Sequence, residues 1–338
     1  MSEYVRAVVD KLANGNRPAQ DEMSTAFEAI LAGDASPDLI AAFLMGLRMR
    51  GETVDDIVAG ARVMRRHART VRAPESAIDT CGTGGLNWVS LNTSTAAALV
   101  AAGAGAIVAK HGNRSVPPKI GSGDVLEALG VNLAPSDAQL EASFRDAGVA
   151  FMFAPSHHAA MKHVAPVRKA LGIRTIFNLL GPLANPAGAK RQVLGVFGAE
   201  WLEPYARALS DLGTERAWVV HGRDGLDEIS TVGTTIVAEL KDGEVRMFEL
   251  SPEEMGVTRR TVDQLRGGTV EENAEALRRV LAGDPSPFAD LVMVNAAAAL
   301  VVAEIVPDLK SGIEAARSSI LMGKAINALE NLRRATND

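Results

Sequence analysis

The stretch "AIDTCGTGGLNWVSLNTSTAAALVAAGAGAIVAK", residues 77–110, decides the fold. "AIDT" predicts a short strand, the glycines an exit loop, "NTSTAAALVAAGAGA" a helix that begins near Asn92, and "GAIVAK" (105–110) a second strand. A strand, a helix and another strand in this order are typical of the right-handed crossover unit of a parallel sheet. We therefore expect an α/β domain from this point of the chain onward.

The same alternation continues toward the C-terminus. Strand-like runs recur as "VAFMFA" (149–154), "RQVLGVFG" (191–198) and "RAWVVHG" (216–222), with helical stretches such as "SDAQLEASFRDAG" between them. "TTIVAELKDGEVRMFEL" predicts an antiparallel hairpin that turns at Asp242-Gly243. Because the last fifty residues return to a helical pattern, we predict a mainly parallel central sheet followed by C-terminal helices.

The first part of the chain is predicted to be helical throughout. One helix begins with Ser36 as its N-cap and ends at Gly51, and no strand-like run precedes residue 71. We therefore predict a small helical domain over residues 1–72 and a larger α/β domain over residues 73–338. A later helical segment near residues 160–180 is expected to pack on the helical domain.

Composition limits the class of protein. The 338 residues are 47% hydrophobic and 22% charged, as in an average soluble domain. The net charge of −6 argues against nucleic acid as a partner, and the single cysteine, Cys81, excludes a disulfide framework and fits a reducing cytosol. The longest apolar run, residues 291–306, contains Asn295 and Glu304, so it predicts a buried helix rather than a membrane span. We expect a cytoplasmic protein with no membrane partner.

The glycine loop and the residues after it indicate an anion site. Gly82, Gly84 and Gly85 occupy three of four positions, and such a cluster is retained where φ is positive or a ligand approaches the backbone. A tight turn is the alternative for the glycines, and an N-cap is the alternative for each polar residue of Asn92–Thr95. Together, at a helix N-terminus, they favour phosphate. The spacing matches neither the nucleotide-triphosphate nor the dinucleotide motif.

Two further loops follow predicted strands, and in open α/β sheets ligands bind at such exits. In "AKHGNRSVPPKIGSGD", Lys110 directly follows an apolar strand, so its ammonium is aimed at the carboxyl edge of the sheet and suits a phosphate. "HGRDGLDEIST" carries Asp227 and Glu228. Adjacent acids are commonly solvated, but beside a phosphate site they become candidate ligands for Mg²⁺.

The segment "APSHHAAMKHVAPVRKALGIRTIFNLLGPLANPAG" contains several unusual residues. The spacing of its histidines does not resemble a zinc site, so a polar lining or surface positions are predicted for His157, His158 and His163. Arg168 follows Pro166 and is expected at a kink, pointing inward. "NLLGPLANP" predicts a rigid connecting turn rather than a catalytic loop.

Taken in order and spacing, the motifs "GTGG", "N-x-S-T", "KHGNRS", "HVAPVRKALGIRTIFNLLGPL-NP" and "GLDE" resemble those of anthranilate phosphoribosyltransferases over essentially the whole chain. The resemblance implies a small helical domain joined to a larger α/β domain, an active site at the hinge, and a homodimer formed through the helical domain. It implies transfer of a phosphoribosyl group from 5-phosphoribosyl 1-diphosphate to the amine of anthranilate, with release of pyrophosphate, in tryptophan biosynthesis.

The resemblance also assigns residues. Matching positions imply that the diphosphate sugar contacts Gly82, Gly85, Leu86, Ser90, Asn92, Thr93, Ser94, Thr95, Lys110, His111, Gly112, Asn113, Arg114, Ser115, Val116, Pro117, Pro118 and Ser122. Anthranilate would contact Gly82, His111, Asn113 and Arg168. Two Mg²⁺ ions per active site would be held with help from Ser94, Asp227 and Glu228, and the catalytic residues would be Lys110, Asp227 and Glu228. No general base is identified.

The chain departs from the family pattern in two places. Leu86 stands where "GTGGD" has Asp, and "SVPPKIG" replaces "SVSSKSG", so that Pro117 and Pro118 remove two backbone donors. A pyrimidine-nucleoside phosphorylase-like enzyme shares the architecture but is not expected to carry "KHGNRS". A non-catalytic homologue that binds nucleic acid would need a basic face, which the net charge disfavours.

Overall fold

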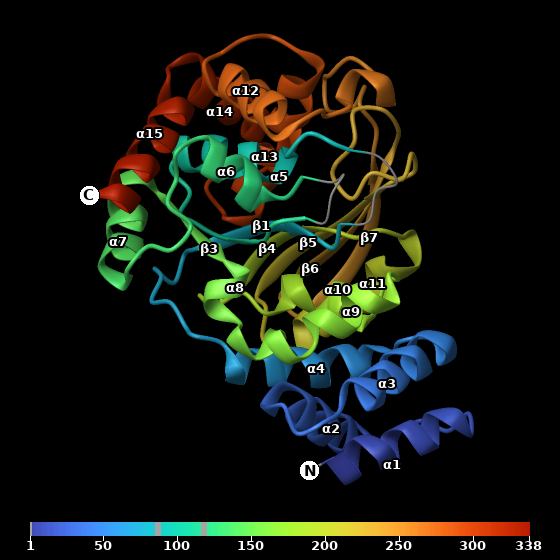
Figure 1. Ribbon diagram of the computed structural model, residues 1–338. Coiled ribbons are helices and arrows are strands. Elements are labelled where there is room, and N and C mark those ends of the chain that lie inside the picture. Colours follow the sequence, from blue (N-terminus) through green and yellow to red (C-terminus); the bar gives the residue numbers. More distant parts are fainter. Residues whose placement is uncertain (1, 85–88, 116–119) are drawn as a thin grey trace.

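The computed structural model describes residues 2–84, 89–115 and 120–338. A single seven-stranded sheet lies at its centre, with the strand order β3-β2-β1-β4-β5-β6-β7 (Figure 1). The strands are β1 (Ile78–Gly82), β2 (Val108–Gly112), β3 (Val149–Phe153), β4 (Arg191–Gly195), β5 (Arg216–Gly222), β6 (Thr235–Lys241) and β7 (Glu244–Leu250). The first five are parallel, and β6 and β7 are antiparallel additions.

Helices cover both faces of the sheet. Figure 1 shows the C-terminal helices with α5 and α6 above it, and α8–α11 followed by the N-terminal helices below it. The helices are α1 (Ser2–Ala13), α2 (Gln20–Ala32), α3 (Pro37–Arg50), α4 (Val54–His67), α5 (Thr93–Gly103), α6 (Ser122–Ala128), α7 (Asp137–Ala142), α8 (Ala154–His157), α9 (Ala165–Leu171), α10 (Ile176–Leu180), α11 (Leu202–Asp211), α12 (Val270–Leu281), α13 (Pro287–Val302), α14 (Leu309–Leu321) and α15 (Lys324–Asn337). The predicted fold class, a helical part followed by a mainly parallel α/β domain, is confirmed.

Local chemistry explains where the N-terminal helices begin and end. The Ser36 hydroxyl accepts from the N–H of Leu39 at 3.4 Å, and α3 ends where Gly51 takes a φ of 87°. Thr53 and Asp56 form a reciprocal capping box at the start of α4, in which the Asp56 carboxylate accepts from the N–H of Thr53 at 2.8 Å. Such caps satisfy the backbone groups that the first and last turns leave unpaired.

The N-terminal helices are tied to the α/β domain through α4. This helix packs against α10 and α11, and one hydrophobic core runs from the N-terminal helices through α9–α11 to the lower face of the sheet. The Arg65 guanidinium donates to the carbonyl of Leu183 at 2.7 Å and to the carbonyl of Leu212 at 3.0 Å. Within the described ranges no helix has the length and apolarity needed to cross a bilayer.

The centre of the sheet is open at its carboxyl edge. Strand β1 pairs with β4 along its whole length, and β2 does the same with β3. Between β1 and β2, however, the register holds a single pair, Ile78 with Val108. Because the backbone ladder ends there, side chains link the remaining residues of the two strands: the Lys110 ammonium donates to the carbonyl of Thr80, and the Asp79 carboxylate accepts from the N–H of His111.

Candidate active site

A cavity of about 640 Å³ lies at this open edge, between the loops that leave β1 and β2 and the helices α8–α10. Twelve residues assigned by the sequence line it: Gly82, Asn92, Ser94, Thr95, Lys110, His111, Gly112, Asn113, Arg114, Ser115, Ser122 and Arg168. The other lining residues are Met64, Cys81, Thr83, Gly84, Gly121, Ala154, Pro155, His158, Ala159, Met161, Lys162, Ala165, Phe177, Asn178, Gly181 and Pro182.

One end of the cavity attracts anions. Lys110 is only 3% exposed, and its ammonium donates to the carbonyl of Thr80 at 2.6 Å and to the hydroxyl of Ser94 at 3.2 Å. Burial lowers the pKa of Lys110, which the nearby Asp79 carboxylate opposes. Ser94 and Thr95 lie in the first turn of α5, and the Thr95 hydroxyl is buried without a hydrogen-bond partner in the described part of the chain. A cation and a helix N-terminus converge here.

The two acids after β5, Asp227 and Glu228, do not line the cavity themselves but contact residues that line this end of it. The Asp227 carboxylate accepts from the backbone N–H of Gly84 at 3.0 Å, and Glu228 accepts from the backbone N–H of Ser94. A Cβ on Gly82 would lie 2.9 Å from the Asp227 Oδ2, and Gly84 has a φ of 64°, which explains two of the glycines in the loop. The loops that leave β1 and β5 are therefore joined directly.

The environment of these acids favours a bound cation. Burial raises the pKa of Asp227, and burial together with the Asp227 charge raises the pKa of Glu228 to about 8. Among the described residues no group of three or more His, Cys, Asp or Glu side chains could hold a metal ion alone. Two carboxylates and the Ser94 hydroxyl are hard oxygen donors, and Mg²⁺ typically completes its shell with substrate and water oxygens. The donor set fits Mg²⁺ bound together with an anionic ligand.

The other end of the cavity is less polar. The rings of His111 and His158 lie 5.1 Å apart, and the Nε2 atom of each is buried with no hydrogen-bond partner in the described ranges. Burial lowers the pKa of His111 to about 3 and that of His158 to about 4, so both rings are neutral. The predicted polar lining is therefore correct for His158. His157 is buried beside it, with Nδ1 2.9 Å from the carbonyl of Arg69.

Arg168 supplies the cation at this end. Its guanidinium donates to the Asn178 Oδ1 at 3.4 Å and lies 5.8 Å from the centre of the Phe177 ring. Burial lowers its pKa. The prediction of a kink was wrong, because Pro166 occupies the first turn of α9, where a missing N–H costs no hydrogen bond. Arg168 lines the cavity from within a regular helix.

The segment interpreted as a connecting turn also contributes to the site. Residues 176–180 form α10, at whose start the Asn178 Oδ1 accepts from the backbone N–H of Thr175 at 3.0 Å, and a 3₁₀ turn follows over Gly181–Leu183. Phe177, Asn178 and Pro182 line the cavity. Sequence reasoning missed these residues because two prolines and a glycine suggested a turn and drew attention away from the T-x-x-N spacing of Thr175 and Asn178.

Some assigned residues lie elsewhere. Ser90 forms an isolated bridge with Arg266, and its carbonyl accepts from the Asn273 amide at 3.1 Å, outside the lining of the cavity. Thr93 is buried in the first turn of α5 and does not line the cavity either. Gly85, Leu86, Val116, Pro117 and Pro118 lie outside the described residues.

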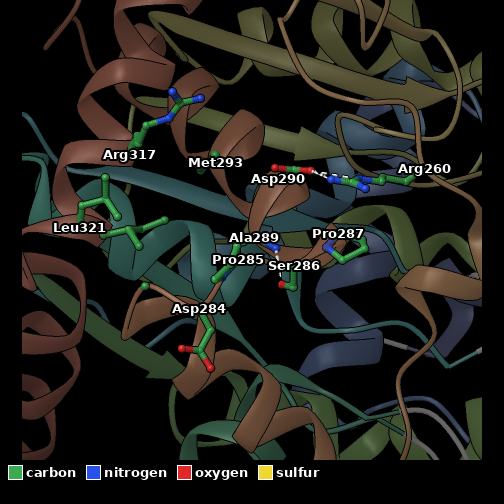
Figure 2. Close-up of a pocket in the computed structure, with 12 residues that line it drawn as sticks. Arg260, Asp284, Pro285, Ser286, Pro287, Ala289, Asp290, Met293, Arg317 and Leu321 are labelled. Atoms are coloured by element: carbon green, nitrogen blue, oxygen red, sulfur yellow. Dashed lines mark hydrogen bonds and ion pairs between the residues drawn. The ribbon is translucent and has the colours of Figure 1, made fainter.

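A second cavity, of about 440 Å³, lies beside α13 and α14 (Figure 2). Several of its polar groups are bonded to other residues of the chain. Arg260 forms an ion pair with Asp290, and the Ser286 hydroxyl caps α13 by accepting from the N–H of Ala289 at 3.1 Å. None of the residues assigned from the sequence lines it.

Comparison with known proteins agrees with this architecture. Residues 6–68 match the helical bundle domain of a glycosyl transferase family, and residues 74–326 match the a/b domain of the same family. The chain is therefore a member of the glycosyl transferases built from these two domains.

More similar relatives define the subgroup. The anthranilate phosphoribosyltransferase of Parvibaculum lavamentivorans is 52% identical over 98% of this chain and 97% of that protein. The one from Hyphomonas neptunium is 50% identical over 100% of this chain and 99% of that protein. The crystal structure of the Thermus thermophilus enzyme superposes with a TM-score of 0.92 at 43% identity, over 98% and 99% of the two chains. This chain belongs to the anthranilate phosphoribosyltransferase family.

Proposed function

We propose that this protein transfers the phosphoribosyl group of 5-phosphoribosyl 1-diphosphate to the amine of anthranilate, giving N-(5-phosphoribosyl)anthranilate and pyrophosphate in tryptophan biosynthesis. The observation that carries the proposal is the polarity of one cavity. Lys110 and the N-terminus of α5 form its anion end, and Arg168 lies with neutral histidines and Phe177 at the other end. A diphosphate sugar and an aromatic acid need these two environments.

At the donor end, charge stabilisation does the chemical work. As the bond from C1 of the ribose to the diphosphate oxygen breaks, the electron pair leaves with pyrophosphate. The Lys110 ammonium and the N–H groups at the start of α5 are already aimed at that charge, so little reorganisation is needed. Asp227, Glu228 and Ser94 would hold Mg²⁺, two ions per site, which when bound supplies further neutralisation of the diphosphate. A Saccharomyces cerevisiae relative, 28% identical with a TM-score of 0.91 over 99% of this chain and 98% of that chain, was solved in complex with PRPP and Mg.

At the acceptor end, positioning dominates. The Arg168 guanidinium would bind the carboxylate of anthranilate, and His111, Asn113 and the Gly82 backbone would border the ring. The aromatic amine is neutral at pH 7, so it attacks C1 without prior deprotonation and loses a proton once the new C–N bond has formed. Holding the amine beside C1 is the main contribution of the protein. Another structure of the yeast relative contains 4-fluoroanthranilate.

A homodimer formed through the N-terminal helices is also proposed. Tyr4 on α1 is 55% exposed and Met49 at the end of α3 is 82% exposed, so both apolar side chains are available for a contact between the helical parts of two copies. Light scattering during gel filtration should give twice the chain mass of 35.5 kDa. A Met49→Asp variant that stays folded should shift the mass toward the monomer.

Anthranilate fluorescence provides the test of the activity. The purified protein should remove anthranilate emission only when 5-phosphoribosyl 1-diphosphate and Mg²⁺ are both present. Omission of either component is the control, and pyrophosphate should form in equal amount. Steady emission with all three components present, from a protein with an intact melting transition, would overturn the proposal.

A further inference from the structure

Asp79 is a buried carboxylate for which the proposed mechanism has no use. It is the second residue of β1, is 0% exposed, and its pKa is raised by burial. Burying an ionisable carboxyl group costs free energy unless it is hydrogen-bonded well, and an apolar residue is often equally stable at such a position. The contacts of Asp79 therefore indicate what its presence achieves.

Hydrogen bonds reach Asp79 from β2, from β4 and from the turn that follows α10. Oδ1 accepts from the backbone N–H of His111 at 3.2 Å. Oδ2 accepts from the Asn185 amide at 2.8 Å and, at 3.5 Å, from the Gln192 amide. Gln192 also donates to the carbonyl of Pro182 at 3.0 Å, and Pro182 lines the cavity.

These contacts replace the missing backbone ladder. After the single Ile78–Val108 pair, the N–H of His111 finds the Asp79 carboxylate in place of a β1 carbonyl. Asn185 strengthens the same junction, because its amide donates to the carbonyl of Ala109 on β2 at 2.8 Å as well as to Asp79. The Asp79 side chain thus anchors the backbone of His111 to β1, while the β2–β3 ladder holds it on the other side.

We propose that Asp79 is a positioning residue for the acceptor half of the site, which fixes His111 against His158 and orients the wall that holds the aromatic acid. The inference rests on the proposed function. The Lys110 ammonium keeps its own hydrogen bonds to Thr80 and Ser94, although the Asp79 charge also favours its protonated form. Loss of the Asp79 carboxylate should therefore weaken use of anthranilate more than binding of the diphosphate sugar.

Asp79→Asn is the direct test, since it keeps shape and volume. An amide has one acceptor oxygen, so it can satisfy His111 or Asn185 but presents N–H groups to the other. We expect the KM for anthranilate to rise about ten-fold, equivalent to about 1.4 kcal/mol. The Kd for 5-phosphoribosyl 1-diphosphate, measured by calorimetry, should change less than about two-fold. Asn185→Ala, which releases the second anchor but leaves the carboxylate on His111, should give a smaller change of the same kind.

A spectroscopic signature distinguishes positioning from general weakening of the fold. The chain has six histidines, so ¹⁵N-histidine labelling gives six backbone amide signals. The His111 signal, shifted downfield by its bond to a carboxylate, should move upfield in Asp79→Asn. Ser319→Ala is the matched control, because it removes a buried hydroxyl that donates to the carbonyl of Val100 at 2.8 Å in the layer of α5 and α14. Ser319→Ala should lower the melting temperature without changing the KM for anthranilate or the Kd for 5-phosphoribosyl 1-diphosphate.

The outcomes are separable. Equal losses for both substrates, or an unmoved His111 signal, would overturn the role of Asp79. If Asp79→Asn does not fold, an anthranilate KM for Asn185→Ala equal to that of the wild type would do the same. If the wild-type protein fails to consume anthranilate, the proposed function fails instead, whatever the amide signal shows.

Discussion

Asp227 lies directly over Gly195. A Cβ placed on Gly195, the last residue of β4, would lie 1.6 Å from the carbonyl oxygen of Asp227 and 3.1 Å from its Cα. No side chain fits at such a separation, so the absence of one at the end of β4 allows the loop after β5 to cross the sheet edge and reach Gly84.

Gly195→Ala should therefore displace Asp227 and impair the metal-dependent step. We expect at least a ten-fold loss of turnover, because displacement of one strong electrostatic group costs more than about 1.4 kcal/mol at the transition state. Turnover measured across a magnesium titration is the readout. Gly233→Ala, whose new Cβ would meet Asp224 at an ordinary 3.5 Å, is the matched control. Wild-type magnesium dependence in Gly195→Ala would contradict the placement of Asp227.

Asp227→Asn combined with Glu228→Gln should cut turnover sharply without unfolding the protein. Neutral amides preserve shape, so packing is little changed, but a cation loses its anionic ligands. Loss of this electrostatic contribution should cost about 2.7–4 kcal/mol, a factor of about 10² to 10³ in rate. Steady-state kinetics and a melting curve test both parts. Unchanged turnover with normal melting would show that the pair does not bind the metal.

Stability without metal should depend on pH through Glu228. Its pKa rises from the ordinary 4.5 to about 8 in the folded protein. Between these values the folded state retains a proton that the unfolded chain releases, so the free energy of unfolding falls as pH rises toward about 8. In EDTA, the wild-type melting temperature should fall more than that of Glu228→Gln between about pH 6 and about pH 8.5. Parallel curves for the two proteins would argue against this titration.

Arg168→Met should weaken use of anthranilate and leave binding of the diphosphate sugar nearly intact. The change keeps the apolar stem beside Phe177 but removes a charge-assisted hydrogen bond of about 1.5–3 kcal/mol. Calorimetry with each substrate separates the two effects. Lys169→Met, on the exposed side of the same helix, is the control and should leave both affinities unchanged. Equal loss of both affinities in Arg168→Met would point to a folding defect.

The neighbouring rings of His111 and His158 should stay neutral across the working pH range. Their pKa values of about 3 and about 4 place protonation of His111 and His158 well below neutrality, because burial disfavours the charged ring. In ¹⁵N spectra recorded from about pH 5 to about pH 8, two of the six histidine rings should show no titration. A ring signal of His111 that titrates near its ordinary pKa would contradict the buried arrangement.

Much of the fold follows from local sequence signals. The caps of α3 and α4 have the residues that the chemistry requires, and the hairpin turns at Asp242-Gly243 as expected, with φ values of 52° and 80°. The prediction for "GAIVAK" began too early: Gly105 has a φ of 103° and ends the preceding turn, so β2 starts at Val108. Positive φ at a glycine ends a turn as readily as it shapes a ligand loop, and sequence alone does not separate the two.

The site was less accessible to sequence reasoning because it depends on contacts distant in sequence. Lys110 was found because it directly follows the apolar run of residues 105–109, a local signal, although the strand continues to Gly112. The role of Asp79 depends on the short backbone ladder between β1 and β2, and the role of Asn178 depends on where α10 packs. In the sequence, Asp79 only interrupts a short apolar strand. Its role becomes visible through its hydrogen bonds with residues 111, 185 and 192, which are distant in the sequence.

The two halves of the cavity wall come from different parts of the chain, and this affects how the specificity of such enzymes can be redesigned or can diverge. Its less polar half comes largely from one continuous segment between residues 154 and 182, whereas the anion half comes from the ends of β1 and β2 and the start of α5. Substitutions confined to that segment can therefore alter which amine is accepted while the sugar donor stays the same. Different amine acceptors could be explored by exchanging about thirty consecutive residues. Arg65 and the caps of α4 should be left unchanged, because they hold the N-terminal helices against the rest of the chain.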